Sequence, residues 1–358
     1  MRCLAGLVCV LALGVMGCSE TSGTGGSAGD GGGGVGGAAG DGGGGVGGSP
    51  ALCVDNVCAC TEAGIRAAIA EGGGPFTFDC DGLTTVVPGA LIDIENDVIL
   101  DGEGNLTVET GFFLVDDEIM VELRGFVFTN GSCLANIDPG TLIIRNCTIT
   151  ASDCSAVGVG PVFNSGAMTL TDSTVSENEG TGKSQVGGGI HNLGWMSITN
   201  STVSGNTEVI AGGGIYNDGT MLITNSTVSG NMASGSGGGI ANGGEMLITN
   251  TLVDNDCRGV AVSGGHNIES PGNTCGFDQA KGDQFDVTAE QLNLGPLQDN
   301  GGPTMTHALL PGSVAIDQIP EADCVDADGA ALTTDQRGEP RPETGGTMCD
   351  VGAFEVQP

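Results

Sequence analysis

The chain of 358 residues holds 68 glycines, 3% aromatic residues, and 9 basic against 44 acidic side chains, for a net charge of −35. Glycine costs a helix interior about 1 kcal/mol per residue, which excludes a helical bundle, and the glycines lack the strict triplet period of collagen. The negative charge excludes nucleic acid and anionic lipid surfaces as partners, and it is compatible with divalent cations or basic partners.

Residues 1–18 predict an export signal, because Arg2 precedes an apolar run that is too short to span a membrane. The run ends in VMGC (15–18), which resembles the lipobox of bacterial lipoproteins. This resemblance implies that Cys18 is lipidated and tethers the chain to a membrane. Ser19 at the next position favours the outer membrane or cell surface. Plain secretion with cleavage elsewhere is the alternative.

Residues 19–50 are nearly all small or polar, and an eleven-residue unit repeats at 28–38 and 39–49. Such a segment cannot bury a core, so we expect a flexible tether with a root-mean-square span of about 30 Å. A calcium-binding nonapeptide array is the alternative, but aspartate does not recur at a nine-residue period.

Residues 61–80 predict an amphipathic helix followed by a strand. Thr61 is the expected N-cap, and Ile65, Ala68 and Ile69 share one face. A helix of this kind would cover the open end of a stack of strands.

Internal repetition carries the fold prediction. Three stretches align without gaps at 25 residues: GGGIHNLGWMSITNSTVSGN (187–206), GGGIYNDGTMLITNSTVSGN (212–231) and GGGIANGGEMLITNTLVDND (237–256). Aligned positions place apolar residues in columns, one of which contains Met168, Met196, Met221 and Met246. Since no unit can bury its own apolar side, we expect each strand to pair with its counterpart one coil away.

Asparagine recurs as regularly as the apolar residues. One column contains Asn164, Asn192, Asn217 and Asn242; a second contains Asn178, Asn206 and Asn231; a third contains Asn200, Asn225 and Asn250. A ligand-binding array is one interpretation. Because these positions lie beside turns, we favour ladders of side-chain amides that bond to each other and to backbone.

The repeats resemble those of polymorphic outer-membrane proteins, within the pectate-lyase-like superfamily. The resemblance implies an all-β, right-handed, single-stranded parallel β-helix with a short N-terminal cap helix, over residues 51–290. It also implies that cleavage of acidic polysaccharide must be considered.

Residues 291–358 lose the period. Their motifs LGPLQDNGGPTMTHALLPGSVAIDQ (294–318), TDQRGEPRP (334–342) and CDVGAFE (349–355) resemble the choice-of-anchor Q domain. This resemblance implies export and surface anchoring, and it predicts location better than chemistry.

Fourteen cysteines indicate an oxidising compartment. Three precede the folded part, which leaves an odd number, so at most five disulfides and one free thiol can form. Cys257 with Cys275 and Cys324 with Cys349 are the pairings we expect, although sequence alone does not determine connectivity.

No catalytic residue is assigned. A lyase needs a base together with carboxylates that hold calcium, and a hydrolase needs clustered carboxylic acids. The basic residues between 141 and 258 do not align from one repeat to the next, and neither do the acidic residues of the clean repeats. His191 shares a column with Tyr216 and Ala241, and we expect it to be an outward surface residue.

Acidic residues are dense at 93–122, where Asp116, Asp117 and Glu118 are the best candidates for a calcium site. A solvated acidic face is the alternative. A second, weaker candidate consists of Asp323, Asp326 and Asp328.

We therefore expect a monomeric, lipid-anchored surface protein that acts as a non-enzymatic stalk, adhesin or carbohydrate-binding scaffold. Extracellular or cell-wall polysaccharide is the candidate ligand, and calcium is the candidate cofactor. A polysaccharide lyase or glycoside hydrolase acting on acidic polysaccharide is the alternative.

Overall fold

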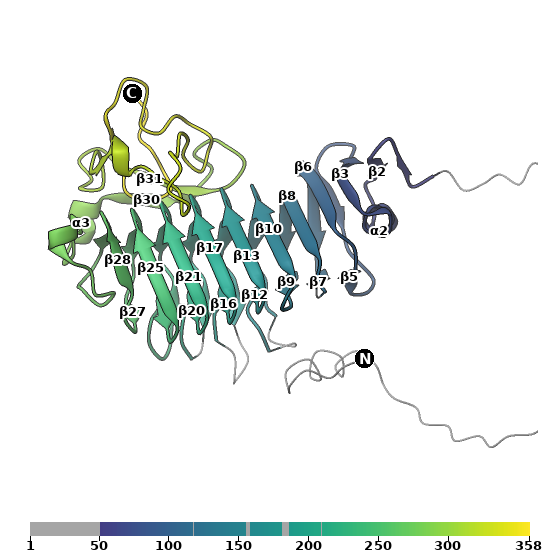
Figure 1. The fold of residues 1–358 in the computed structure, drawn as a ribbon, viewed down its shortest axis with the longest axis horizontal. Helices are drawn as coiled ribbons and strands as arrows, with labels where there is room; N and C mark the ends of the chain where they lie inside the picture. The colour runs from purple at the N-terminus through teal and green to yellow at the C-terminus, as the bar shows by residue number, and fades with distance from the viewer. Residues whose placement is uncertain (1–50, 117, 155–157, 181–185, 209) are drawn as a thin grey trace, which may run out of the picture. The chain divides into compact units, whose positions relative to one another are not determined.

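The computed structural model describes residues 51–116, 118–154, 158–180, 186–208 and 210–358. The predicted signal peptide, Cys18 and the tether lie outside these residues. Leu52–Pro358 form one compact unit. Its strands stack into a parallel β-helix of about seven turns (Figure 1), which confirms the predicted fold.

The N-terminal end is covered as the sequence predicts. Helix α2 (Glu62–Glu71) begins after Thr61, whose side chain accepts a hydrogen bond from the backbone N–H of Gly64, and the helix buries Ile65, Ala68 and Ile69. A Cβ on Gly64 would lie 1.9 Å from the carbonyl oxygen of Ala59, so only glycine allows this close approach. Two disulfides, Cys53–Cys58 and Cys60–Cys80, stabilise the cap.

The coils contribute strands to three sheets, and two small antiparallel pairs follow. The 18-stranded sheet contains β1 (Cys53–Val54), β2 (Val57–Ala59), β3 (Gly73–Asp79), β4 (Thr84–Val86), β6 (Val98–Glu109), β8 (Met120–Thr129), β10 (Thr141–Arg145), β11 (Thr148–Thr150), β13 (Ala167–Thr171), β14 (Thr174–Ser176), β17 (Trp195–Thr199), β18 (Thr202–Ser204), β21 (Thr220–Thr224), β22 (Thr227–Ser229), β25 (Glu245–Thr249), β26 (Leu252–Asp254), β28 (Val262–Gly265) and β29 (Ile268–Glu269). The eight-stranded sheet contains β5 (Ile92–Ile94), β7 (Phe112–Val115), β9 (Cys133–Asn136), β12 (Val162–Asn164), β16 (Ile190–Asn192), β20 (Ile215–Asn217), β24 (Ile240–Asn242) and β27 (Cys257–Arg258). The three-stranded sheet contains β15 (Glu179–Gly180), β19 (Thr207–Glu208) and β23 (Met232–Ala233).

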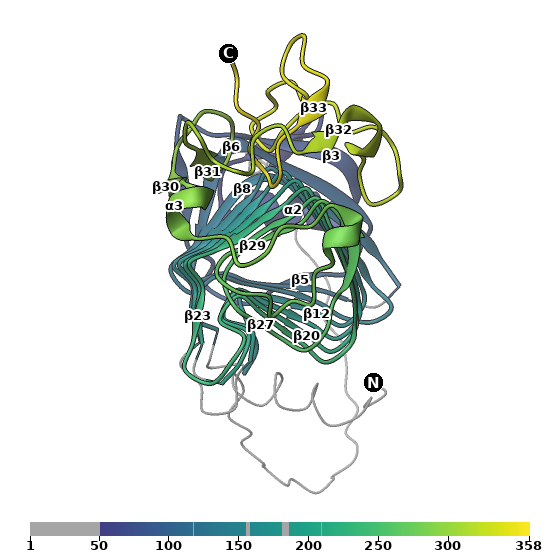
Figure 2. The ribbon, with the colours of Figure 1, turned by 90° about the vertical axis from the view of Figure 1, so that its left-hand side faces the viewer.

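The register is the one predicted from the repeat. Met168 pairs with Met196, Met196 with Met221 and Met221 with Met246, so the methionines form one buried column inside the coil. Alternation along each strand turns the residues between them outward. The core is therefore a set of parallel columns of like side chains. Figure 2 looks along the stack and shows the backbones of successive coils lying over one another.

Two of the asparagine columns are hydrogen-bonded ladders inside the coil. In the first, Asn164 Nδ2 donates to Asn192 Oδ1 at 2.8 Å, and Asn192 Nδ2 donates to Asn217 Oδ1 at 2.7 Å. In the second, Asn178 Nδ2 donates to Asn206 Oδ1 at 2.8 Å and Asn206 Nδ2 donates to Asn231 Oδ1 at 2.9 Å. Both ladders also bond to backbone carbonyls, which confirms the structural interpretation.

The third column is different. Asn200, Asn225 and Asn250 adopt positive φ of 54°, 48° and 53° at the turn between paired strands, a conformation that asparagine tolerates better than most residues. All three side chains are fully buried. Their Nδ2 groups donate to backbone carbonyls of residues 323–334 in the C-terminal block. This column is a docking row rather than a ladder.

The C-terminal block (residues 291–358) contacts that row through these hydrogen bonds, and Figure 1 shows it (yellow) beside the strands of the large sheet. Gln336 is 1% exposed and reaches into the coil corners, where Nε2 donates to Thr174 Oγ1 at 2.9 Å and Oε1 accepts from Thr202 Oγ1 at 2.6 Å. His307 Nε2 lies 2.8 Å from Ser204 Oγ. Residues of the C-terminal motifs therefore fasten the block to the β-helix.

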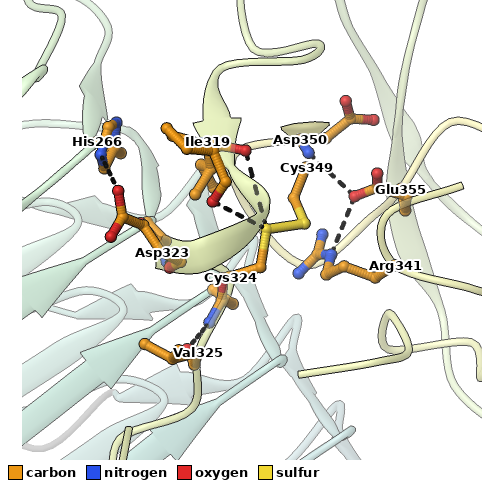
Figure 3. The surroundings of a disulfide bond; sticks show 12 residues. His266, Ile319, Asp323, Cys324, Val325, Arg341, Cys349, Asp350 and Glu355 are labelled. Carbon is orange, nitrogen blue, oxygen red and sulfur yellow. Dashed lines mark hydrogen bonds and ion pairs between the residues drawn. A yellow bond between two sulfur atoms is a disulfide. The ribbon is translucent and has the colours of Figure 1, made fainter. Parts of the chain in front are cut away.

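Inside the block, short elements are held by covalent and ionic links. They are β30 (Leu294–Gln298) paired with β31 (Thr306–Leu309), β32 (Ile319–Pro320) paired with β33 (Met348–Cys349), and the 3-10 helix η2 (Glu321–Asp323). Figure 3 shows the Cys324–Cys349 disulfide beside the buried ion pair of Arg341 and Glu355, whose Nε and Oε2 atoms are 3.0 Å apart. The predicted Cys324–Cys349 pairing is confirmed.

The end of the β-helix is closed by β28, β29, the 3-10 helix η1 (Gln279–Lys281) and helix α3 (Ala289–Leu292). Cys257–Cys275 staples this end, which confirms the second predicted pairing. The fifth disulfide is Cys133–Cys154, and Cys147 is the one free cysteine among the described residues. Burial raises the pKa of the Cys147 thiol to about 12.

Replacement of a central ladder residue should destabilise the β-helix. Asn192→Ala leaves Asn217 Oδ1 without its donor and removes the amide acceptor of Asn164 Nδ2, and each unpaired buried group costs about 1–3 kcal/mol. We expect the free energy of unfolding, measured by chemical denaturation, to fall by at least about 2 kcal/mol. Asn105→Ala is the control, because its side chain makes no hydrogen bond among the described residues. Equal stability of the two variants would contradict the ladder's role.

Gln336→Ala should loosen the C-terminal block while the coils stay intact. The change removes the side chain that bonds to Thr174, Thr202 and Thr304. Hydrogen–deuterium exchange should accelerate in residues 291–358 and stay unchanged in the coils. Gln298→Ala, at an exposed position, is the matched control and should match the wild type. Equal acceleration in the coils would show that the block does not dock as a separable element.

Candidate functional site

His191 points outward as predicted, but it is buried, so the prediction that it lies on the surface is wrong. Its side chain points away from the coil interior at β16, but it is only 9% exposed. The rings of Phe163 and Tyr216 in the neighbouring coils contact the imidazole edge-on, with ring centroids 5.3 and 5.4 Å from its own. Repeat alignment correctly placed His191 and Tyr216 in one column. It could not show that the neighbouring rings cover the histidine.

Burial also determines the protonation state of His191. It lowers the pKa of the imidazole from 6.5 to about 4, against a smaller opposite effect of Asp218. Nδ1 has no hydrogen-bond partner among the described residues. The ring is therefore neutral at physiological pH, and it packs as an aromatic side chain.

His191 should make stability depend on pH. The folded-state pKa of His191 lies below its ordinary value, so the folded state prefers the neutral ring. The contribution of this ring to the free energy of unfolding is fully present above about pH 6.5 and is lost as pH falls towards 4. The loss is on the order of 3 kcal/mol. In His191→Phe this part of the pH dependence should disappear, as measured by denaturant unfolding at pH 7, 5.5 and 4. Parallel curves for wild type and variant would contradict a buried neutral histidine.

The acidic region of the early coils is divided between ion pairs and exposed carboxylates. Glu122 lies 2.9 Å from Arg124 and 3.0 Å from Arg145, and the hydrogen bond from Arg124 is the main cause that lowers its pKa. Burial, and then the charges of Asp116 and Glu95, raise the pKa of Asp93.

The predicted calcium ligands are only partly described. Asp116 follows β7, Glu118 has a φ of 64°, and Asp117 lies outside the described residues. Among the described residues, no three His, Cys, Asp or Glu side chains form a group that could hold a metal ion. Calcium at 116–118 stays a prediction.

The weaker acidic candidate has structural contacts. Asp323 lies 3.4 Å from His266, and its backbone carbonyl accepts from Asn250. Asp326 Oδ1 accepts from the backbone N–H groups of Asp328 and Ala330 and so closes a tight turn.

A groove runs between the outward face of the large sheet and the loop of residues 326–332 in the C-terminal block. Its cavity volume is about 290 Å³, at the small end of the range of roughly 300–1,000 Å³ for ligand sites. The sheet side comes from β10, β13, β17 and β21. The lining residues are Arg145, Thr169, Thr171, Trp195, Ser197, Thr199, Leu222, Asp326, Ala327, Asp328 and Leu332.

Strand register explains this lining. Trp195 pairs with Ala167 on one side and Thr220 on the other, so a large ring stands among smaller outward neighbours and is 43% exposed. Ser197 and Thr199 follow it along β17 at alternate positions. Their hydroxyls face the groove and make no hydrogen bond within the described part of the chain.

The opposite wall is held rigidly. The loop begins after Val325, whose carbonyl accepts from Asn225 Nδ2 at 2.6 Å, and Val325 forms an antiparallel bridge with Ala331. The disulfide of Cys324 anchors its base. The groove is therefore formed before any ligand arrives.

Sequence reasoning missed this groove. A tryptophan at an outward strand position, the only one in the chain, was the available signal. The second wall comes from an aperiodic segment more than a hundred residues away, and the repeat carries no information about where that segment docks.

Comparison with protein-family models, curated proteins and solved structures finds no match for this chain. Within the described residues, no helix combines the length and the apolar character needed to cross a membrane.

Proposed function

We propose that the protein is a surface lipoprotein whose β-helix is a non-enzymatic scaffold that binds polysaccharide in the groove beside Trp195. The observation that supports this proposal most strongly is the lining of that groove. It combines an exposed indole ring with hydroxyls that have no hydrogen-bond partner among the described residues. A sugar ring has an apolar C–H face and a rim of hydroxyls, and such a lining complements both.

The carboxylates of the groove support binding rather than cleavage. Glycoside hydrolysis uses two carboxyl groups on opposite sides of the scissile bond. The carboxylates that line the described groove, Asp326 and Asp328, both lie on the loop wall, and Asp326 already caps a turn.

Anchoring supports the same proposal. The lipobox at residues 15–18 and the glycine-rich segment 19–50 would place the folded part outside the cell at the end of a tether. A rigid stack of coils then offers an extended binding face.

Binding and catalysis can be tested together. The purified full chain, with calcium, is sedimented with insoluble neutral and acidic polysaccharides, and soluble uronate polymers are followed by the ultraviolet absorbance of unsaturated products. We expect co-sedimentation with at least one polysaccharide and no rise in absorbance. A steady rise would make the protein a lyase. Absence of binding to every polymer would overturn the proposal.

Cys18→Ala should abolish lipid attachment. Cells fed a labelled fatty acid should incorporate the label into the wild type and not into Cys18→Ala, because the thiol of Cys18 is the proposed acceptor. Cys9→Ala is the matched control and should still be labelled. Label that persists in Cys18→Ala would contradict lipidation at this residue.

A further inference from the structure

We infer that the groove is a subsite for an uncharged sugar ring, which stacks on Trp195 and is enclosed by the 326–332 loop of the C-terminal block. This inference rests on the proposed function and adds the chemical class of the ligand. It also gives the C-terminal block a part in recognition.

Trp195 provides the stacking surface. Its backbone is fixed, because its carbonyl accepts from Asn164 Nδ2 in the asparagine ladder at 2.9 Å, while 43% of the residue is exposed. Leu222, one coil further and two positions along its strand, continues the apolar surface into the groove. Exposed aromatic rings at rigid positions are typical anchors of binding sites.

Polar contacts would come from β17 and the neighbouring coil. Ser197 and Thr199 line the groove, and their hydroxyls have no partner in the described chain. A ligand hydroxyl that enters the groove would take the place of water as their hydrogen-bond partner. Thr169 and Thr171, which pair with Ser197 and Thr199 in the preceding coil, add two more hydroxyls to the groove lining.

Charge selects against anionic sugars. Among the described residues that line the groove, Arg145 is the one basic side chain, and its Nε already donates to Glu122 Oε1 at 3.0 Å. Asp326 and Asp328 on the opposite wall have no ion-pair partner among the described residues. With a net charge of −35 on the chain, a uronate carboxylate would meet repulsion, whereas an uncharged ring would not.

Trp195 is the only tryptophan, so its fluorescence reports on the groove alone. The full chain is titrated with hexamers of β-1,4-linked glucose, mannose and xylose, and with a hexamer of α-1,4-linked galacturonate. We expect at least one neutral hexamer to shift the emission to shorter wavelength and the galacturonate hexamer to leave it unchanged. A preference for galacturonate would overturn the inference and leave the proposed function standing.

Variants then locate the binding by calorimetry. Trp195→Ala should lower the affinity for the neutral hexamer at least tenfold. Trp195→Phe should retain most of that affinity, because an aromatic ring is kept. Leu83→Ala, at another exposed apolar residue outside the groove lining, should bind like the wild type. Unchanged affinity in Trp195→Ala would overturn the subsite, even where polysaccharide co-sedimentation persists. Failure of both hexamer binding and co-sedimentation would overturn the proposed function as well.

Discussion

Parallel stacking in register is the constraint on which the rest of the structure depends. Each coil places its side chains above those of the coil before, so a polar group inside the coil is buried where the next coil supplies its partner. Asn192 meets this condition by donating to Asn217 while accepting from Asn164. Because each amide of the two ladders needs an amide above it, these two columns reinforce the register that the methionine and isoleucine columns already favour.

The same repetition creates the docking row for the C-terminal block. Asn200, Asn225 and Asn250 occupy one left-handed turn position in successive coils, so their amide groups face outward at regular intervals. The block meets this row with backbone carbonyls of residues 323–334, while Gln336 enters the coil corners between threonine hydroxyls. The repeated asparagine row of the β-helix thus holds the C-terminal block, which has no repeat. The groove beside Trp195 lies between the β-helix and this block.

Polarity divides the faces of the molecule. The early coils are acidic and partly neutralised by Arg124 and Arg145, whereas the outward strand positions further along carry hydroxyl and apolar side chains. The eight-stranded sheet carries an aromatic column instead, in which His191 is neutral because burial lowers its pKa to about 4. The proposed sugar subsite occupies the face where exposed apolar surface and hydroxyls without protein partners coincide.

The repeat by itself determined most of the fold. The 25-residue period determines which residues become neighbours in adjacent coils, so the strand register, the methionine column and the two asparagine ladders could be predicted. The cap helix could be predicted separately, from its N-cap residue and its apolar face. The Cys257–Cys275 and Cys324–Cys349 pairings were also correct. Tertiary structure alone decided that His191 is covered by rings, that the third asparagine column docks a separate block, and that Trp195 faces the 326–332 loop. The physical reason is that a period specifies contacts between equivalent positions, whereas burial and docking depend on side chains from segments that do not share the period.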